Sequence, residues 1–155
     1  MTNVSPATLV DTNVLVYVYD PRDHDKQRQA AIVLDKLIRT EQVVLSVQCL
    51  TEFFNTVTRR LPEPLTLAEA SVRVERLTRL CHVLELTPQA VLEGCRGTVE
   101  HRLSFWDALI WAVAKQNRIP YLLTEDAEHG RFLEGVRFLN PFDPAFDLDA
   151  LSGDL

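Results

Sequence analysis

The sequence predicts an α/β fold, a three-layer α/β/α sandwich with a central, mostly parallel sheet of four to five strands. Two observations lead to this prediction. Short apolar runs typical of buried strands alternate with longer segments of helical periodicity. Such alternation implies parallel strands joined by right-handed helical crossovers. The first apolar run also ends in a charged residue, Asp11, where a central strand would reach the carboxyl end of the sheet.

The N-terminal elements begin with a strand expected at residues 7–11. Residues 14–19 continue apolar and fit either a short helix or an extended segment. Residues 25–40 carry apolar side chains at mixed helical spacing, which predicts a helix. The short apolar run at residues 43–45 predicts the second strand.

Two helices are expected to follow the second strand. Ser46 fits the N-cap of the first, which runs to about Arg60. Thr66 begins the second, which ends near Arg79 and has Glu69 at the capping-box position.

The third strand is expected at residues 82–86, where apolar side chains alternate with polar ones. Pro88 suits the first turn of a helix that runs toward Leu103. Gly94 and Gly97 weaken the middle of that helix, because glycine has a low helix propensity.

The last helix is expected to run from Ser104 to about Asn117, and two further apolar runs, at residues 121–123 and 136–139, complete the sheet. The predicted organisation is one domain at residues 1–142. An acidic tail at residues 143–155 also carries phenylalanines, and the sequence leaves open whether it docks or stays mobile.

Composition supports an ordinary globular chain. A domain of 155 residues buries about two-thirds of its unfolded surface, and 46% hydrophobic with 25% charged residues is typical of globular proteins. Cys49, Cys81 and Cys95 are odd in number and lack CxxC spacing, which favours reduced thiols and no zinc site. No apolar run approaches the roughly 18 residues of a membrane span, so we expect a cytoplasmic protein without membrane association.

The net charge is only a weak indication of whether the protein binds nucleic acid. The formal net charge of −6 counts against a protein whose whole surface grips nucleic acid, but it does not exclude a local basic rim.

Four acidic residues are candidates for one site. Asp11 and Asp126 follow predicted strands and should meet at the carboxyl end of the sheet. Asp107 is the only charged residue between Phe105 and Ala114. Glu52 lies on the polar face of its predicted helix. Capping or solvation explains each acid singly, but not their convergence.

Carboxylates that converge in this way need a counter-charge. They would repel one another and raise their pKa values unless a divalent cation neutralised them. Oxygen-only ligands select Mg²⁺ or Mn²⁺, and such cations typically act on phosphates. The acids therefore point to hydrolysis of a phosphodiester.

Other residues give less specific signals. Arg59 shares the polar helical face of Glu52 and is a candidate phosphate contact, with a solvated arginine as the simpler explanation. His129 follows Asp126 by three residues, yet a surface loop histidine is favoured over a metal ligand. Trp106 and Trp111 could stack on bases, although core or dimer-interface packing is favoured for both.

The four acids lie in short motifs, in the order Leu9-Val10-Asp11-Thr12-Asn13, Thr51-Glu52-Phe53, Ser104-Phe105-Trp106-Asp107-Ala108-Leu109-Ile110 and Leu122-Leu123-Thr124-Glu125-Asp126. In these motifs, over about residues 7–142, the chain resembles the PIN-domain nucleases, in particular the VapC-like toxins of bacterial toxin–antitoxin pairs. The resemblance assigns catalysis and metal binding to Asp11, Glu52, Asp107 and Asp126, with Asn13 and Thr124 as the accompanying polar residues. We expect Asn13 to orient Asp11.

What the resemblance implies is Mg²⁺- or Mn²⁺-dependent cleavage of single-stranded or structured RNA that leaves a 5′-phosphate and a 3′-hydroxyl. It also implies a homodimer and inhibition by a small cognate antitoxin. The acidic balance departs from the basic character of many such toxins. A stand-alone RNA-processing nuclease and a catalytically silent PIN-like binding module are the alternatives.

Three other enzyme classes fit the residues less well. A haloacid-dehalogenase-type phosphatase needs a second acid at position 13, where the chain has Asn13. A phosphoacceptor receiver domain needs an N-terminal acidic pair and a late lysine, which the arrangement does not supply. Histidine-based ribonuclease chemistry lacks an evident histidine pair.

Overall fold

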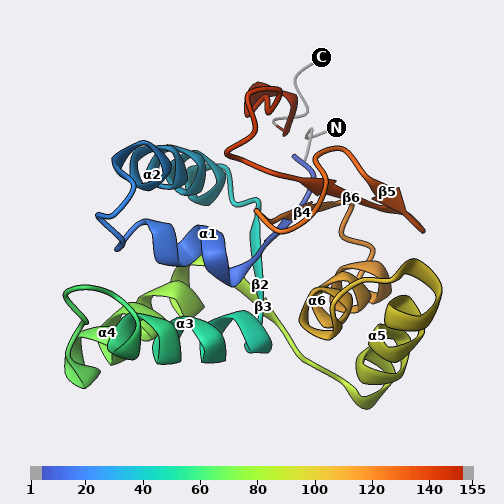
Figure 1. The fold of residues 1–155 in the computed structure, drawn as a ribbon, viewed down its shortest axis with the longest axis horizontal. Helices are drawn as coiled ribbons and strands as arrows, with labels where there is room; N and C mark the ends of the chain where they lie inside the picture. Colours follow the sequence, from blue (N-terminus) through green and yellow to red (C-terminus); the bar gives the residue numbers. More distant parts are fainter. Residues whose placement is uncertain (1–4, 152–155) are drawn as a thin grey trace.

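A six-stranded sheet separates two groups of helices in the computed structural model, which describes residues 5–151 (Figure 1). The strands are β1 (Thr8–Val10), β2 (Val43–Ser46), β3 (His82–Leu84), β4 (Tyr121–Leu123), β5 (Phe132–Leu133) and β6 (Val136–Leu139), in the order β3-β2-β1-β4-β6-β5. Every pair is parallel except β5 with β6. The α/β class and the mostly parallel sheet are confirmed.

The expected count of four to five strands is wrong by one strand, β5. It consists only of Phe132 and Leu133, and it pairs with β6 through a two-residue turn at Glu134 and Gly135. Both turn residues have positive φ, 47° and 92°, which is the geometry of the type I′ turns that match strand twist. A two-residue strand is too short to show a sequence period, so only its hairpin partner defines it.

The helices are α1 (Thr12–Tyr17), α2 (His24–Arg39), α3 (Val47–Arg59), α4 (Leu67–Leu80), α5 (Pro88–His101) and α6 (Phe105–Gln116), with a short 3₁₀ turn at Asp149–Leu151. The expected N-caps are confirmed, since the hydroxyls of Ser46, Thr66 and Ser104 each accept a backbone N–H of the first turn. The apolar segment after Asp11 is helical. α5 ends at His101, short of the expected Leu103.

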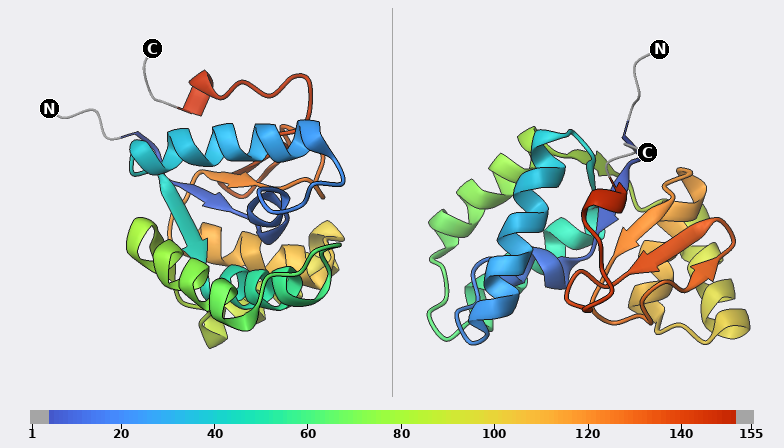
Figure 2. Two further views of the ribbon diagram at one scale, coloured as in Figure 1. Left: turned by 90° about the vertical axis from the view of Figure 1, so that its left-hand side faces the viewer. Right: turned by 90° about the horizontal axis from the view of Figure 1, so that it is seen from above.

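The two faces of the sheet carry separate cores. Side chains alternate along each strand, so Val10 packs with α1 to α4, whereas Leu9 packs with α5 and α6. β2 repeats the pattern, with Leu45 in the first core and Val44 in the second. Figure 2 shows α5 and α6 on the opposite side of the sheet from α2 and α4.

The segment after β6 runs along α2 (Figure 2). Gln29 Nε2 donates to the carbonyl of Pro141 at 3.0 Å, and Gln42 Nε2 donates to the carbonyl of Leu151 at 2.6 Å. Phe146 packs against the α1–α4 core, and Leu151 is only 1% exposed. Of the acidic tail, residues 143–151 therefore lie against the domain, and the rest of it is outside the described residues.

None of the helices between residues 5 and 151 is long and apolar enough to cross a membrane. The three cysteines are free thiols: Cys49 and Cys81 are buried, and Cys95 is exposed.

Candidate active site

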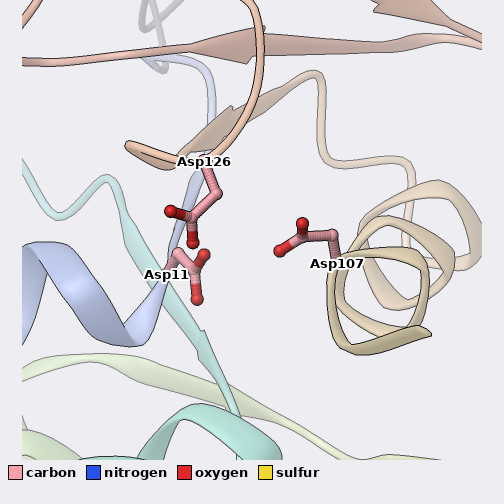
Figure 3. Close-up of side chains that lie close together, drawn as sticks. All are labelled: Asp11, Asp107 and Asp126. Atoms are coloured by element: carbon pink, nitrogen blue, oxygen red, sulfur yellow. The ribbon is translucent and has the colours of Figure 1, made fainter. Parts of the chain in front are cut away.

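Three aspartates converge at the carboxyl end of the parallel strands (Figure 3). Asp11 joins β1 to α1, Asp126 follows β4, and Asp107 lies in the first turn of α6. One carboxylate oxygen from each residue lies within 4.8 Å of those of the other two. Asp11 is buried, Asp107 is half-buried and Asp126 is exposed, so the cluster opens to solvent on one side.

Strand register brings the first and last of these acids together. Val10 pairs with Leu123 across β1 and β4, and the backbone N–H of Asp11 continues the ladder by donating to the carbonyl of Leu123 at 2.9 Å. The residues that follow the two strands, Asp11 and Thr124, are therefore neighbours. The Thr124 hydroxyl donates to Asp11 Oδ2 at 2.8 Å.

The two supporting residues, Asn13 and Thr124, hold different aspartates from those expected. We expected Asn13 to orient Asp11, but Asn13 Nδ2 donates to Asp126 Oδ2 at 3.0 Å. Asp11 is instead held by Thr124 and by the backbone N–H of Thr12, which donates to Oδ1 at 2.7 Å. Each support thus comes from the opposite strand end, and the two strand-end aspartates are fixed relative to each other.

Asp107 reaches the cluster from the other side of the cavity. Ser104 caps α6 by accepting the backbone N–H of Asp107 at 3.2 Å, which fixes the start of the helix. The carboxylate of Asp107 points from α6 toward Asp11 and Asp126 (Figure 3). A residue that fits a capping box in the sequence therefore also projects its carboxylate into the acidic cluster.

The cluster is electrostatically strained. The pKa of Asp11 is raised to about 7, mainly by burial and also by the charges of Asp107 and Asp126, against the opposing hydrogen bonds of Thr124 and Thr12. Burial also raises the pKa of Asp107, helped by Asp126. Among residues 5–151, no lysine, arginine or histidine forms an ion pair with any of the three aspartates.

Glu52 stands beside the three aspartates and is not one of the residues whose oxygens lie within 4.8 Å. It is held on α3 by two donors, Thr12 Oγ1 and Gln48 Nε2, each at 3.1 Å. Its charge contributes to the raised pKa of Asp107, and it lines the same cavity. The structure thus groups all four expected acids around one cavity, with Glu52 in the wall.

The cavity has a volume of about 570 Å³. Its lining includes Asn55 and Thr56 of α3, as the polar helical face predicted. The basic residue in the lining is Arg60, whereas the expected Arg59 is not part of it. Arg60 is the C-cap of α3, with φ −111° and ψ −7°, so its side chain departs from the ideal helical direction on which the choice of Arg59 depended.

Of the remaining candidates, His129 and Trp111 do not line the cavity, whereas Trp106 does. His129 Nδ1 accepts the backbone N–H of Asn140 at 3.0 Å, and its ring packs against Phe146, which gives it a structural contact away from the aspartates. Trp111 is buried in the core, as favoured. Trp106 is 62% exposed and lines the cavity, so it does not belong to the core, and packing at a dimer interface stays a prediction for it. Its position directly before Asp107 was the signal for this placement.

Solved structures share this fold. A toxin–antitoxin complex from Klebsiella pneumoniae aligns with a TM-score of 0.66 at 18% identity, covering 88% of this chain and 99% of that one. The sarcin–ricin loop cleaving toxin VapC20 of Mycobacterium tuberculosis aligns with a TM-score of 0.59 at 22% identity, covering 84% and 99%. PAE2754 from Pyrobaculum aerophilum gives a TM-score of 0.60 at 25% identity, covering 87% and 90%.

The comparison with curated proteins found no significant match. The family model of the PIN domain, however, matches residues 8–133, from β1 to the end of β5 and across all four acids. The expected resemblance is thereby confirmed, and this chain belongs to the PIN domain family.

Proposed function

We propose that this chain is a divalent-metal-dependent endoribonuclease that hydrolyses RNA phosphodiester bonds at the Asp11 cluster. The observation that carries the proposal is the convergence of three aspartate oxygens within 4.8 Å without a cationic partner among residues 5–151. Three carboxylates placed so closely favour an external cation, because their mutual repulsion is otherwise uncompensated.

The donor set fits Mg²⁺ or Mn²⁺. The ligands would be Asp11, Asp107 and Asp126, with Glu52 in the adjoining wall, and all of them offer hard oxygen atoms. The raised pKa of Asp11 has the direction expected of a buried carboxylate that lacks its counter-ion. Bound there, a divalent cation supplies Lewis-acid polarisation of a phosphate and a lower pKa for a coordinated water.

The protein groups contribute orientation and charge. Thr124 and the N–H of Thr12 keep one oxygen lone pair of each Asp11 oxygen engaged, which fixes the direction of the remaining lone pairs. Asn13 does the same for Asp126 Oδ2. Glu52, held by two donors, keeps acceptor capacity for a hydrogen bond from water in the cavity.

The biological setting we propose is that of a type II toxin, active in the cytoplasm as a homodimer and inhibited by a cognate antitoxin. Support comes from the PIN family membership and from structural neighbours described as a toxin–antitoxin complex and as a sarcin–ricin loop cleaving toxin. A growth-arrest assay tests this setting: induced expression should stop growth, and co-expression of the protein encoded beside it should restore growth.

The chemistry is tested with purified protein and a labelled RNA. Cleavage should require Mg²⁺ or Mn²⁺, stop on addition of a chelator, and fall at least a hundredfold in Asp11→Asn and Asp107→Asn variants. Glu85→Gln is the matched control, because Glu85 is an exposed carboxylate outside the cavity. Equal cleavage by wild type and Asp11→Asn would overturn the proposal.

A further inference from the structure

The lining of the cavity also contains an exposed aromatic residue, Trp106, whose ring contacts the neighbouring Phe105 with ring centroids 5.6 Å apart. Trp106 is 62% exposed although it is the larger of two adjacent aromatic residues at the start of α6. A single exposed aromatic is ordinary on a protein surface. This one lines the cavity that contains Asp107, the next residue in the chain.

The backbone beneath the ring is fixed. Ser104 caps α6 two residues earlier, and Gln48 Nε2 donates to the Trp106 carbonyl at 3.3 Å. The same Gln48 amide also holds Glu52 at 3.1 Å, so one side chain of α3 ties the aromatic residue to an acidic wall residue. The indole is therefore an exposed flat surface on a rigid support, directly beside the candidate site of cleavage.

Charge in the cavity argues against binding by phosphate contacts alone. Among the described residues that line it, the acids are Asp11, Asp20, Glu52, Asp107 and Asp126, and the only cationic side chain is that of Arg60. Affinity for nucleic acid usually comes from lysine and arginine contacts to phosphates. A single arginine in the lining offers few phosphate contacts, even with a cation bound at the aspartates, and aromatic stacking on bases is a neutral source of additional affinity.

The positions of the cavity-lining residues on α3 suit a single RNA strand that lies along this helix. Gln48 contacts Trp106 at one end of this helix, and Arg60 lines the cavity at the other end. Arg60 follows Gln48 by twelve positions, which corresponds to a rise of about 18 Å along the helix. This rise exceeds the roughly 3.4 Å spacing of stacked nucleotides several times over. Glu52 lies between the two ends, so a strand bound along this path would cross the acidic cluster.

We propose that Trp106 is the residue of this chain that recognises an unpaired base, by stacking its indole on that base beside the acidic cluster, an inference that rests on the proposed function. A paired base has both faces covered by its neighbours in the helix, so it offers no face to the indole. The stacking contact favours unpaired segments of any sequence, since every base has a π-face.

Binding of a short unpaired oligoribonucleotide tests the inference separately from cleavage. In an Asp11→Asn background, binding should quench tryptophan fluorescence, and Trp106→Phe should remove the quenching while keeping most of the affinity. Trp106→Ala should weaken binding about tenfold to a hundredfold. Phe132→Ala is the matched control, because Phe132 is an exposed aromatic residue on β5 outside the cavity.

Cleavage kinetics give the second measurement. On an RNA hairpin, the wild type should cut in the unpaired loop, and Trp106→Ala should raise KM on that loop by a similar factor with little change in kcat. Oligonucleotide binding that depends on Trp106 would sustain the inference even if no RNA were cleaved, in which case the proposed function alone fails.

Unchanged oligonucleotide affinity in Trp106→Ala would overturn the inference. If that variant also sediments as a smaller species than the wild type, the exposed indole covers a second copy of the chain instead.

Discussion

Hydrogen bonds hold the Asp11 carboxylate in position, but its surroundings do not stabilise the ionised form. Its two oxygens accept from Thr124 and from the N–H of Thr12, yet burial and the neighbouring aspartates still raise its pKa to about 7. The hydrogen bonds therefore fix the geometry of a carboxylate that the site leaves without a counter-ion. Such stored electrostatic cost is typical of residues retained for function.

The raised pKa gives a pH dependence of stability. Between about pH 4 and pH 7, the folded metal-free protein holds a proton on Asp11 that the unfolded chain has already lost, so stability falls as the pH rises through this window. The loss is up to about 4 kcal/mol, from a shift of about three pKa units. Urea unfolding at pH 4.5 and pH 7.5 measures it.

The Asp11→Asn variant isolates this contribution. It should be more stable than the wild type at pH 7.5 and closer to it at pH 4.5, and Mn²⁺ should stabilise only the wild type appreciably. A stability difference between the two proteins that does not change with pH would contradict the assignment to Asp11.

Two adjacent arginines form a matched pair for substrate binding. Arg60 lines the cavity and Arg59 does not, although both are exposed. Arg60→Met should raise KM for RNA about threefold to tenfold, as expected for loss of one phosphate contact of about 1 kcal/mol. Arg59→Met should leave KM within twofold. Steady-state cleavage assays at fixed ionic strength decide, and equal effects of both substitutions would favour a general charge effect.

At the scale of elements, the sequence was sufficient to predict where a helix begins, because the hydrogen bonds of a helix N-cap join residues close in the chain. Ser46, Thr66 and Ser104 could be assigned as caps because an N-cap bond spans only three residues. β5 could not be assigned, because its two residues become a strand only through pairing with β6. The helical state of α1 was equally open, since a six-residue apolar segment shows less than two turns of periodicity.

The glycines of α5 show how packing reverses a local interpretation. Gly97 weakens the helix by propensity, but it lies where α5 meets Trp111 of α6. A Cβ at this position would lie 2.7 Å from Trp111 Cζ3. Trp111 is itself held, because its ring is buried and its Nε1 donates to the carbonyl of Leu133 at 3.2 Å. The glycine therefore permits a close helix–helix contact.

Gly97→Ala tests this interpretation. Alanine gains about 1 kcal/mol of helix propensity over glycine, but overpacking a fixed core typically costs about 1–3 kcal/mol. We expect a net loss of stability in urea unfolding. Val99→Ala is the matched control on the same helix, since Val99 is exposed and should change stability by less than about 0.5 kcal/mol. Stabilisation by Gly97→Ala would show that α6 can move aside.

At the scale of the molecule, the part of the site set by sheet topology could be predicted. Parallel strands end at one side of the sheet, which was sufficient to bring Asp11 and Asp126 together. The approach of Asp107 depends on how α6 packs on the sheet, and no local pattern gives that distance. Arg59 was chosen by continuing an ideal helix to its last turn, where the C-cap backbone at Arg60 departs from helical geometry.

The end of the chain links the two ends of the sheet. Phe142 packs against Tyr17 of α1 beyond the carboxyl end of the strands, with ring centroids 4.9 Å apart. From there the chain runs along α2 to Leu151, whose carbonyl accepts from Gln42, the residue before β2. The sequence left this docking open because acidic and aromatic residues alternate there, and the decision depends on contacts with distant elements.

Leu151→Ala should therefore weaken the fold without affecting the site. Leu151 is 1% exposed in the α1–α4 core, and truncating a buried leucine costs about 2–5 kcal/mol. We expect the lower part of this range, because Leu151 lies in a three-residue 3₁₀ turn, which can relax more easily than a long helix. Leu67→Ala, at an exposed leucine of α4, is the control and should change the free energy of unfolding by less than about 0.5 kcal/mol.

Because Gln42 precedes β2 at the amino end of the sheet and Asp11 follows β1 at the carboxyl end, RNA cleavage by Leu151→Ala should match the wild type wherever both proteins are folded. A loss of cleavage in fully folded Leu151→Ala protein would show instead that the C-terminal segment holds the site in place.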